Sequence, residues 1–143
     1  MTIRMAALAV VLACAGGGYA IAQQDLHAVV KSIITDTVDG DEILVGRLRS
    51  GELEEGESEE FSIRIDPDKE YMVYSSCDFD CYDLDLAIVD EDGDDIDTDY
   101  ENDDVPIIAV EADESGDTLN IRIDMEGCDE EVCIWAVGVY EQP

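Results

Sequence analysis

The sequence predicts an all-β fold: an antiparallel, jelly-roll-like β-sandwich of about eight strands. Short segments in which apolar and polar residues alternate recur at roughly ten-residue spacing, as is typical of sandwiches. Turn-forming pairs such as Asp92-Gly93 separate these segments. Close cysteine pairs in the same region are typical of small exported domains. The pattern does not fit a parallel α/β sheet, which would need helices between its strands.

Residues 1–22 are predicted to be a secretory signal peptide. Arg4 gives a positive start, Met5–Ala15 is apolar, and Ala20-Ile21-Ala22 has the small-x-small form of a cleavage site. The apolar stretch is too short to span a bilayer, so we expect no membrane span and a secreted or periplasmic location. An alternative takes Cys14 as the acylated cysteine of a lipoprotein, although this would leave an unusually short apolar core after Arg4.

An N-terminal segment, residues 23–42, follows the leader. Within it, Leu26–Ile34 fits either a short helix or a strand. Ile43–Arg49 is predicted to be the first strand, because it follows the turn at Asp39-Gly40-Asp41, and Gly51–Gly56 is predicted to be a turn region. The sandwich domain is expected over residues 43–143.

Later strands are predicted from alternating residues and from the turns that bound them. Phe61, Ile63 and Ile65 alternate with polar residues until Pro67 ends their strand. The remaining strands are expected, in order, at Glu70–Ser76, Leu84–Val89, Ile96–Tyr100, Pro106–Ala112, Leu119–Met125 and Val132–Tyr140.

Four cysteines remain once Cys14 is removed with the leader, an even number that predicts disulfides in an oxidising compartment. Three connectivities are possible for four cysteines. We favour the local pairs, Cys77 with Cys81 and Cys128 with Cys133, because each pair brackets a predicted turn. A zinc site built from the four thiolates is the alternative, disfavoured by export and by the single histidine of the chain, His27.

The chain is strongly acidic, with 38 Asp and Glu against 7 Lys and Arg and a net charge of −31. Such a polyanion repels nucleic acids and anionic membrane surfaces. The partners it could attract are divalent cations, basic protein surfaces, or components of an extracellular matrix or polysaccharide. Adaptation to saline surroundings, where salt screens the repulsion, would also explain most of these acids.

The chain resembles the bacterial pre-peptidase C-terminal (PPC) domain, in a disulfide-bearing subgroup of exported proteins. The residues that carry the resemblance are Leu53-x-x-Gly56-Glu57-x-x-x-Phe61-x-Ile63-x-Ile65, Tyr71, Asp83-Leu84-Asp85-Leu86, the Asp-Gly turn and the two cysteine loops. The resemblance covers about Ile43–Tyr140. It implies a jelly-roll-like sandwich without catalytic activity, of the kind appended to secreted hydrolases; related collagen-binding modules bind calcium and matrix. No stretch of this sequence resembles a protease domain.

The acidic residues in and after the first cysteine loop predict a calcium site. Calcium prefers six to eight oxygen ligands, which closely spaced carboxylates supply. The candidate ligands are Asp78, Asp80, Asp83 and Asp85. In the alternative interpretation, Asp83 and Asp85 cap backbone N–H groups or face solvent. An EF-hand around Gly93 is excluded, because Ile88 would occupy its first ligand position.

The expected function is that of a non-catalytic, exported binding or accessory module, with calcium as a candidate cofactor. A Ser-His-Asp or Cys-His site would have to use His27, which we expect to be solvent-exposed and outside the sandwich. Alternatives are a structural or cell-surface component assembled through divalent cations and, more weakly, a small hydrolase. Among the aromatic residues, Tyr82 and Tyr100 are expected to be exposed, and Trp135 is expected to belong to the core or the sheet surface.

Overall fold

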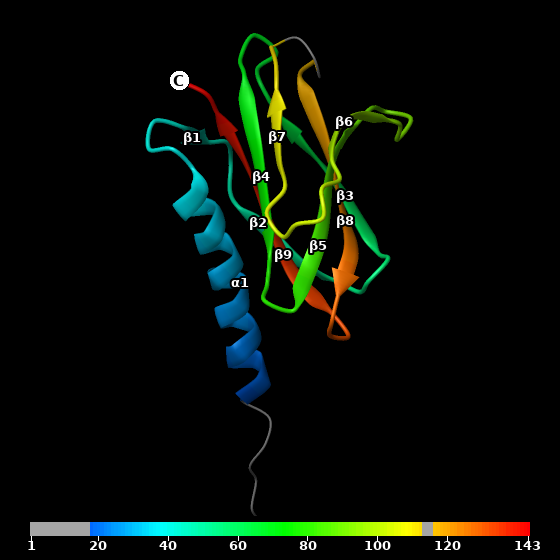
Figure 1. The fold of residues 1–143 in the computed structure, drawn as a ribbon. Helices are drawn as coiled ribbons and strands as arrows, with labels where there is room; N and C mark the ends of the chain where they lie inside the picture. The colour runs from blue at the N-terminus through cyan, green and yellow to red at the C-terminus, as the bar shows by residue number, and fades with distance from the viewer. Residues whose placement is uncertain (1–17, 113–115) are drawn as a thin grey trace, which may run out of the picture.

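Two antiparallel sheets packed face to face, with one helix against the outside of the sandwich, make up the computed structural model (Figure 1). It describes residues 18–112 and 116–143. Its elements are α1 (Gly18–Thr37), β1 (Ile43–Leu44), β2 (Arg49–Leu53), β3 (Ser58–Arg64), β4 (Tyr71–Cys77), β5 (Cys81–Val89), β6 (Asp95–Asp99), β7 (Ile107–Val110), β8 (Thr118–Cys128) and β9 (Cys133–Glu141). The predicted all-β sandwich is confirmed, with nine strands in the described residues. Cys14 and most of the predicted leader lie outside these residues, and α1 begins at Gly18, within that leader.

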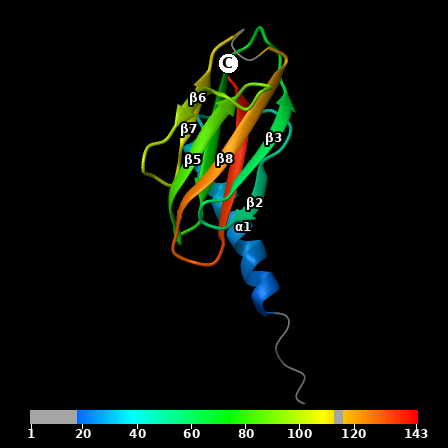
Figure 2. The same ribbon diagram turned by 90° about the vertical axis from the view of Figure 1, so that its right-hand side faces the viewer.

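The first sheet has the strand order β1-β9-β4-β7, with β2 also paired to β9. Strands β1 and β2 meet different parts of β9: Leu44 lies opposite Tyr140, and Gly51 lies opposite Trp135. The second sheet has the order β3-β8-β5-β6 and faces the viewer in Figure 2. All of these pairings are antiparallel.

The core lies between the sheets and is built from alternate residues of each strand. Leu84, Leu86 and Ile88 of β5 are at most 1% exposed, because every second side chain of a strand points to the same face. The same period in β8 buries Leu119, Ile121, Ile123 and Met125. The alternation read in the sequence therefore identified the inner face of this sheet correctly.

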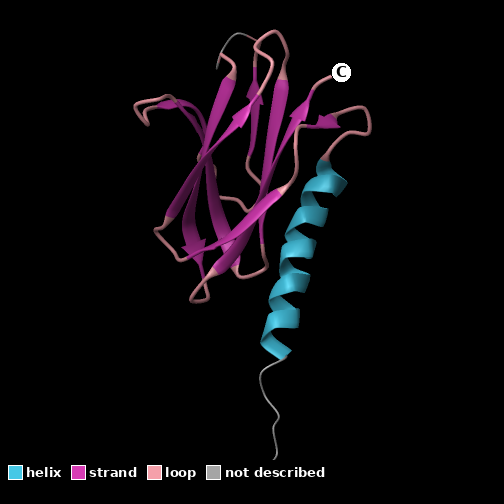
Figure 3. Cartoon of the chain, turned by 180° about the vertical axis from the view of Figure 1, so that it is seen from behind, coloured by secondary structure: helices cyan, strands magenta, loops and turns pink. Residues whose placement is uncertain are grey.

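Helix α1 covers the outer face of the first sheet (Figure 3). Val30 and Ile34 are one helical turn apart, share a face and are fully buried against Tyr74, Ile134, Ala136 and Tyr140. Ser76 Oγ in β4 donates a 2.6 Å hydrogen bond to Val30 O, so the helix is also held by a buried polar contact. The segment Leu26–Ile34, which the sequence left open between helix and strand, is helical.

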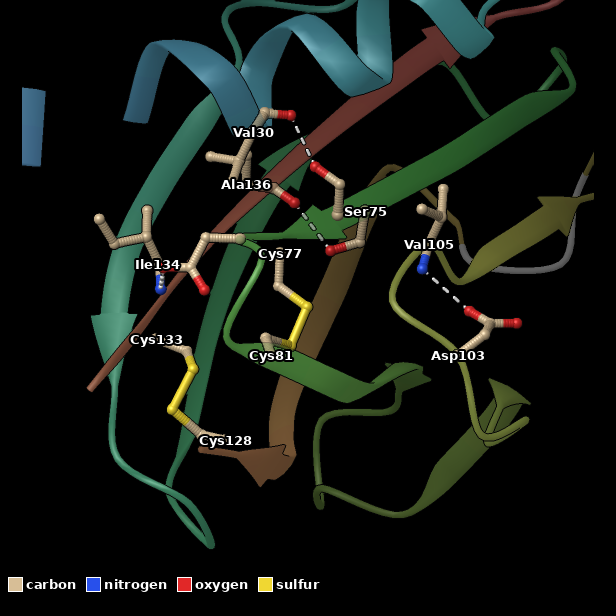
Figure 4. The surroundings of a disulfide bond; sticks show 12 residues. Val30, Ser75, Cys77, Cys81, Asp103, Val105, Cys128, Cys133, Ile134 and Ala136 are labelled. Carbon is tan, nitrogen blue, oxygen red and sulfur yellow. Dashed lines mark hydrogen bonds between the residues drawn. A yellow bond between two sulfur atoms is a disulfide. The ribbon is translucent and has the colours of Figure 1, made fainter. Parts of the chain in front are cut away.

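Both disulfides join the predicted local pairs, Cys77–Cys81 and Cys128–Cys133. Figure 4 shows the two bonds close together, and Cys81 lies directly opposite Cys128 in the ladder between β5 and β8. Each bond runs from one sheet to the other, because β4 and β9 belong to the first sheet and β5 and β8 to the second. The disulfides therefore clamp the two sheets together at one end of the sandwich.

The predictions for residues 43–56 are wrong in detail. The expected strand Ile43–Arg49 is interrupted by Gly46, whose φ of 74° is left-handed and incompatible with a strand. The expected turn region Gly51–Gly56 begins inside β2, since Gly51 and Leu53 pair with β9. The Asp92-Gly93 hairpin turn between β5 and β6 is confirmed, with a φ of 85° at Gly93.

Candidate functional site

Asp78 is a buried carboxylate in the loop closed by Cys77 and Cys81. Asp78 is only 5% exposed, and its Oδ2 accepts a 2.8 Å hydrogen bond from Ile134 N. Its backbone N donates in turn to Ile134 O at 3.0 Å, which fixes the loop against β9. The second carboxylate oxygen, Oδ1, is buried and has no hydrogen-bond partner.

Asp78 lines a surface hollow of about 240 Å³, which we call the acidic hollow. The other residues of its wall are Leu26, Asp80, Glu130, Glu131, Val132 and Ile134. Its acids come from the two disulfide loops, which are joined by a 2.8 Å hydrogen bond from Asp129 N to Asp80 O. The hollow therefore lies at the clamped end of the sandwich.

Asp83 and Asp85, the other two predicted calcium ligands, lie in β5 beyond this hollow. Asp83 Oδ2 accepts a 2.8 Å hydrogen bond from Asn102 Nδ2, and Asp85 lies opposite Asp124 in the ladder between β5 and β8. Burial, followed by the nearby charges of Asp83 and Glu126, raises the pKa of Asp85 from 3.8 to about 6. Within residues 18–112 and 116–143, no three acidic, histidine or cysteine side chains come together in a group that could coordinate a metal ion. Calcium binding by these four residues stays a prediction.

A second hollow, of about 310 Å³, lies where α1 and β2 meet, and we call it the basic hollow. Its wall consists of Lys31, Arg47, Leu48, Arg49, Ser50, Glu59 and Trp135. These residues come from α1, the β1–β2 connection, β2, β3 and β9. No pattern in the sequence predicted this site, although Arg47 and Arg49 lie two residues apart in a chain with only seven basic residues.

Stacked rings support one side of the basic hollow. The guanidinium of Arg49 lies 4.5 Å from the ring centre of Phe61, within cation–π range. Phe61 in turn stacks on Trp135, with centroids 6.2 Å apart and an angle of 8° between the ring planes. These contacts restrict the position of the Arg49 side chain.

His27 is partly buried beside the basic hollow rather than solvent-exposed, so that prediction is wrong. Its Nδ1 lies 3.0 Å from Ser50 Oγ, and its Nε2 lies 3.7 Å from Glu52 Oε1. The histidine side chain is 28% exposed, because α1 packs over β2 at this point. The expected exposure of Tyr82 and Tyr100 is confirmed, and Trp135 belongs to the core.

No protein-family model matches this chain, and no curated protein matches it either. Within the described residues, no helix has both the length and the apolar character needed to cross a membrane.

Proposed function

We propose that this chain is an exported, non-catalytic binding module that holds a basic side chain of a protein partner in the acidic hollow. The observation that carries the proposal is the buried Asp78, whose Oδ1 has no hydrogen-bond partner. An unpaired buried carboxylate oxygen costs free energy, which a bound cationic donor would recover. Asp80, Glu130 and Glu131 line the same hollow and add negative charge.

A guanidinium or ammonium group suits this hollow better than a metal ion does. Calcium needs several oxygens within 2.3–2.6 Å, and no three carboxylates of the described chain are arranged in that way. The disulfide loops that carry the acids are short, which limits their movement toward a central ion. A guanidinium has five donors in a planar fork and contacts carboxylates that are further apart.

The charge of the whole chain favours the same class of partner. A net charge of −31 attracts basic surfaces over a distance of roughly a Debye length and accelerates their encounter with the module. A secreted hydrolase is the partner that the resemblance to PPC domains suggests. The two disulfides suit an oxidising extracellular or periplasmic compartment, as such a partnership requires.

The test is a titration with N-acetylarginine amide, followed by amide NMR. Ile134 N–H is bonded to Asp78 Oδ2, so its resonance reports directly on the hollow. We expect this resonance to shift saturably, and to shift much less with N-acetylcitrulline amide, which is neutral. Asp78→Asn should abolish the shift while keeping the acceptor for Ile134 N, and the exposed Asp92→Asn should keep it.

Two outcomes would overturn this function. If N-acetylarginine amide leaves the Ile134 resonance unmoved up to the solubility limit, the hollow does not bind a basic side chain. If calcium chloride shifts this resonance and the arginine derivative does not, the occupant is calcium. Near-UV circular dichroism of Asp78→Asn would establish that the variant is folded.

A small hydrolase is the second candidate, and it is favoured by the 3.0 Å contact between Ser50 Oγ and His27 Nδ1. Glu52 lies 3.7 Å from the other ring nitrogen, so the order of groups is that of a serine nucleophile, a base and an acid. A fluorophosphonate probe would label Ser50 in such an enzyme, and Ser50→Ala would prevent labelling. We expect no labelling of the wild-type protein.

A further inference from the structure

We propose a second binding site of opposite charge: the basic hollow binds a small, sugar-sized ligand that carries one phosphate or sulfate group. This site is separate from the acidic hollow, with which it shares no lining residue.

The first support is the distribution of the few positive charges. Three of the six basic residues in the described chain, Lys31, Arg47 and Arg49, line this one hollow. Lys69 and Arg122 are paired with acids, whereas these three, like the exposed Arg64 outside the hollow, have no carboxylate within 4.0 Å among the described residues. A protein with 38 acidic residues has thus left three neighbouring cations unpaired, and an anion would satisfy them.

The second support is an unpartnered buried donor on Trp135, a residue that lines the hollow. Trp135 is 1% exposed, and its Nε1–H is buried without a hydrogen-bond partner. An indole N–H is a donor only and cannot lose its proton, so only an acceptor can satisfy it. An oxyanion that reaches the indole from the hollow would supply this acceptor.

The site is also partly preorganised. Arg49 is stacked on Phe61, which is stacked on Trp135, so less side-chain entropy is lost when Arg49 binds a ligand. Ser50 Oγ, in contact with His27, adds a hydroxyl to the same wall. Glu59 is the one acid of the lining, so the lining side chains carry a net charge of +2 at neutral pH.

Size and charge define the ligand class. The three cations suit a phosphate monoester, which carries two negative charges. A sulfate ester, which carries one, belongs to the same class of ligand. The hollow, about 310 Å³, is at the lower end of small-molecule sites. Nucleic acids and other polyanions are disfavoured, because the net charge of −31 repels every phosphate that lies outside the hollow.

The test uses intrinsic fluorescence, because Trp135 is the only tryptophan of the chain. The probes are potassium phosphate, potassium sulfate, glucose 6-phosphate and glucose 6-sulfate, with glucose and potassium chloride at matched ionic strength as controls. We expect a saturable change with the phosphate or sulfate compounds and none with the controls. Stronger binding of the esters than of the inorganic ions would identify an ester as the ligand, whereas equal binding would identify the free ion.

Matched variants locate the binding. Arg47→Gln should weaken it by about tenfold or more, the usual effect of losing one charge-assisted hydrogen bond. Arg64→Gln removes an exposed arginine of β3 outside the hollow and should leave binding unchanged. Asp78→Asn should also leave this binding unchanged, so the proposals for the basic hollow and for the acidic hollow are tested independently.

Three results would overturn the proposal. The first is the absence of a saturable change with all four compounds. The second is an equal loss in Arg47→Gln and Arg64→Gln, which would indicate a general charge effect. The third is saturable binding of sodium acetate in place of the phosphate and sulfate compounds, which would identify a carboxylate ligand.

Discussion

The indole of Trp135 lies directly against the backbone of Gly51, its partner in the neighbouring strand. A Cβ atom on Gly51 would stand 2.8 Å from Trp135 Cζ2 and 2.9 Å from Nε1, closer than real Cβ contacts occur. Glycine in the middle of a strand is otherwise unfavourable, so this close approach explains its presence in β2. The large ring could not fill this part of the core if residue 51 had a side chain.

Gly51→Ala should therefore destabilise the domain by about 1–3 kcal/mol, the usual cost of overpacking a core. Trp135 is 1% exposed and stacked on Phe61, so it cannot move away. Urea unfolding measures the loss. Gly127→Ala is the matched control: its Cβ would stand 2.4 Å from Tyr82 Cε2, but Tyr82 is 51% exposed and can rotate outward. Equal losses in the two variants would contradict this explanation.

Asp85 should make the domain more stable as the pH falls from 7 toward 4. Its pKa is raised to about 6 in the folded protein, against 3.8 ordinarily, so between these values the folded state binds more protons than the unfolded state. Asp85→Asn mimics the protonated side chain. We expect this variant to raise the free energy of unfolding at pH 7 by about 1–3 kcal/mol. The free energy of unfolding should also depend less on pH between the folded and unfolded pKa values of Asp85.

The matched control for this pH dependence is Asp92→Asn, an exposed change that removes the same charge from the β5–β6 turn. Urea unfolding at a series of pH values compares the two variants with the wild type. A pH slope that is unaltered in Asp85→Asn would show that other carboxyl groups cause it.

If Asp78, Asp80, Asp83 and Asp85 form the predicted calcium site, calcium should raise the melting temperature at millimolar concentrations, because binding to the native state alone adds stability. Sodium chloride should raise it only at much higher concentration, by screening the net charge of −31. Replacing Asp83 and Asp85 together by Asn should remove the calcium effect and keep the sodium effect. A full calcium response in this double variant would place the site elsewhere.

Sedimentation with and without calcium would show whether the ion assembles copies of the chain.

Local patterns in the sequence were sufficient for much of the sandwich. Alternation with period two placed Leu84, Leu86 and Ile88 in the core, since successive side chains of a strand point to opposite faces. The disulfide pairing was predictable for a similar reason. A turn between cysteines that are 4 or 5 residues apart brings each pair within bonding distance, without help from the rest of the chain.

Leu26–Ile34 could not be assigned from its own residues. Val30 and Ile34 are buried because α1 lies on an outer sheet face formed by β4 and β9, and these strands come much later in the chain. Similarly, Ile43–Arg49 looks like one strand in sequence, but Gly46 turns the chain so that β1 and β2 pair with different parts of β9. Such long-range pairing overrides local propensity.

The sequence by itself determined most of the strands after residue 56, favoured the local cysteine pairs and showed the strong acidity of the chain, because each of these depends on neighbouring residues or on composition. Only the tertiary structure decided that both disulfides join one sheet to the other. It also separated Asp78 and Asp80 from Asp83 and Asp85, because Cys81 begins β5 between the two pairs. Lys31, Arg47 and Trp135 meet at one hollow only because α1 packs beside β2 and β2 pairs with β9, and no spacing along the chain encodes that meeting.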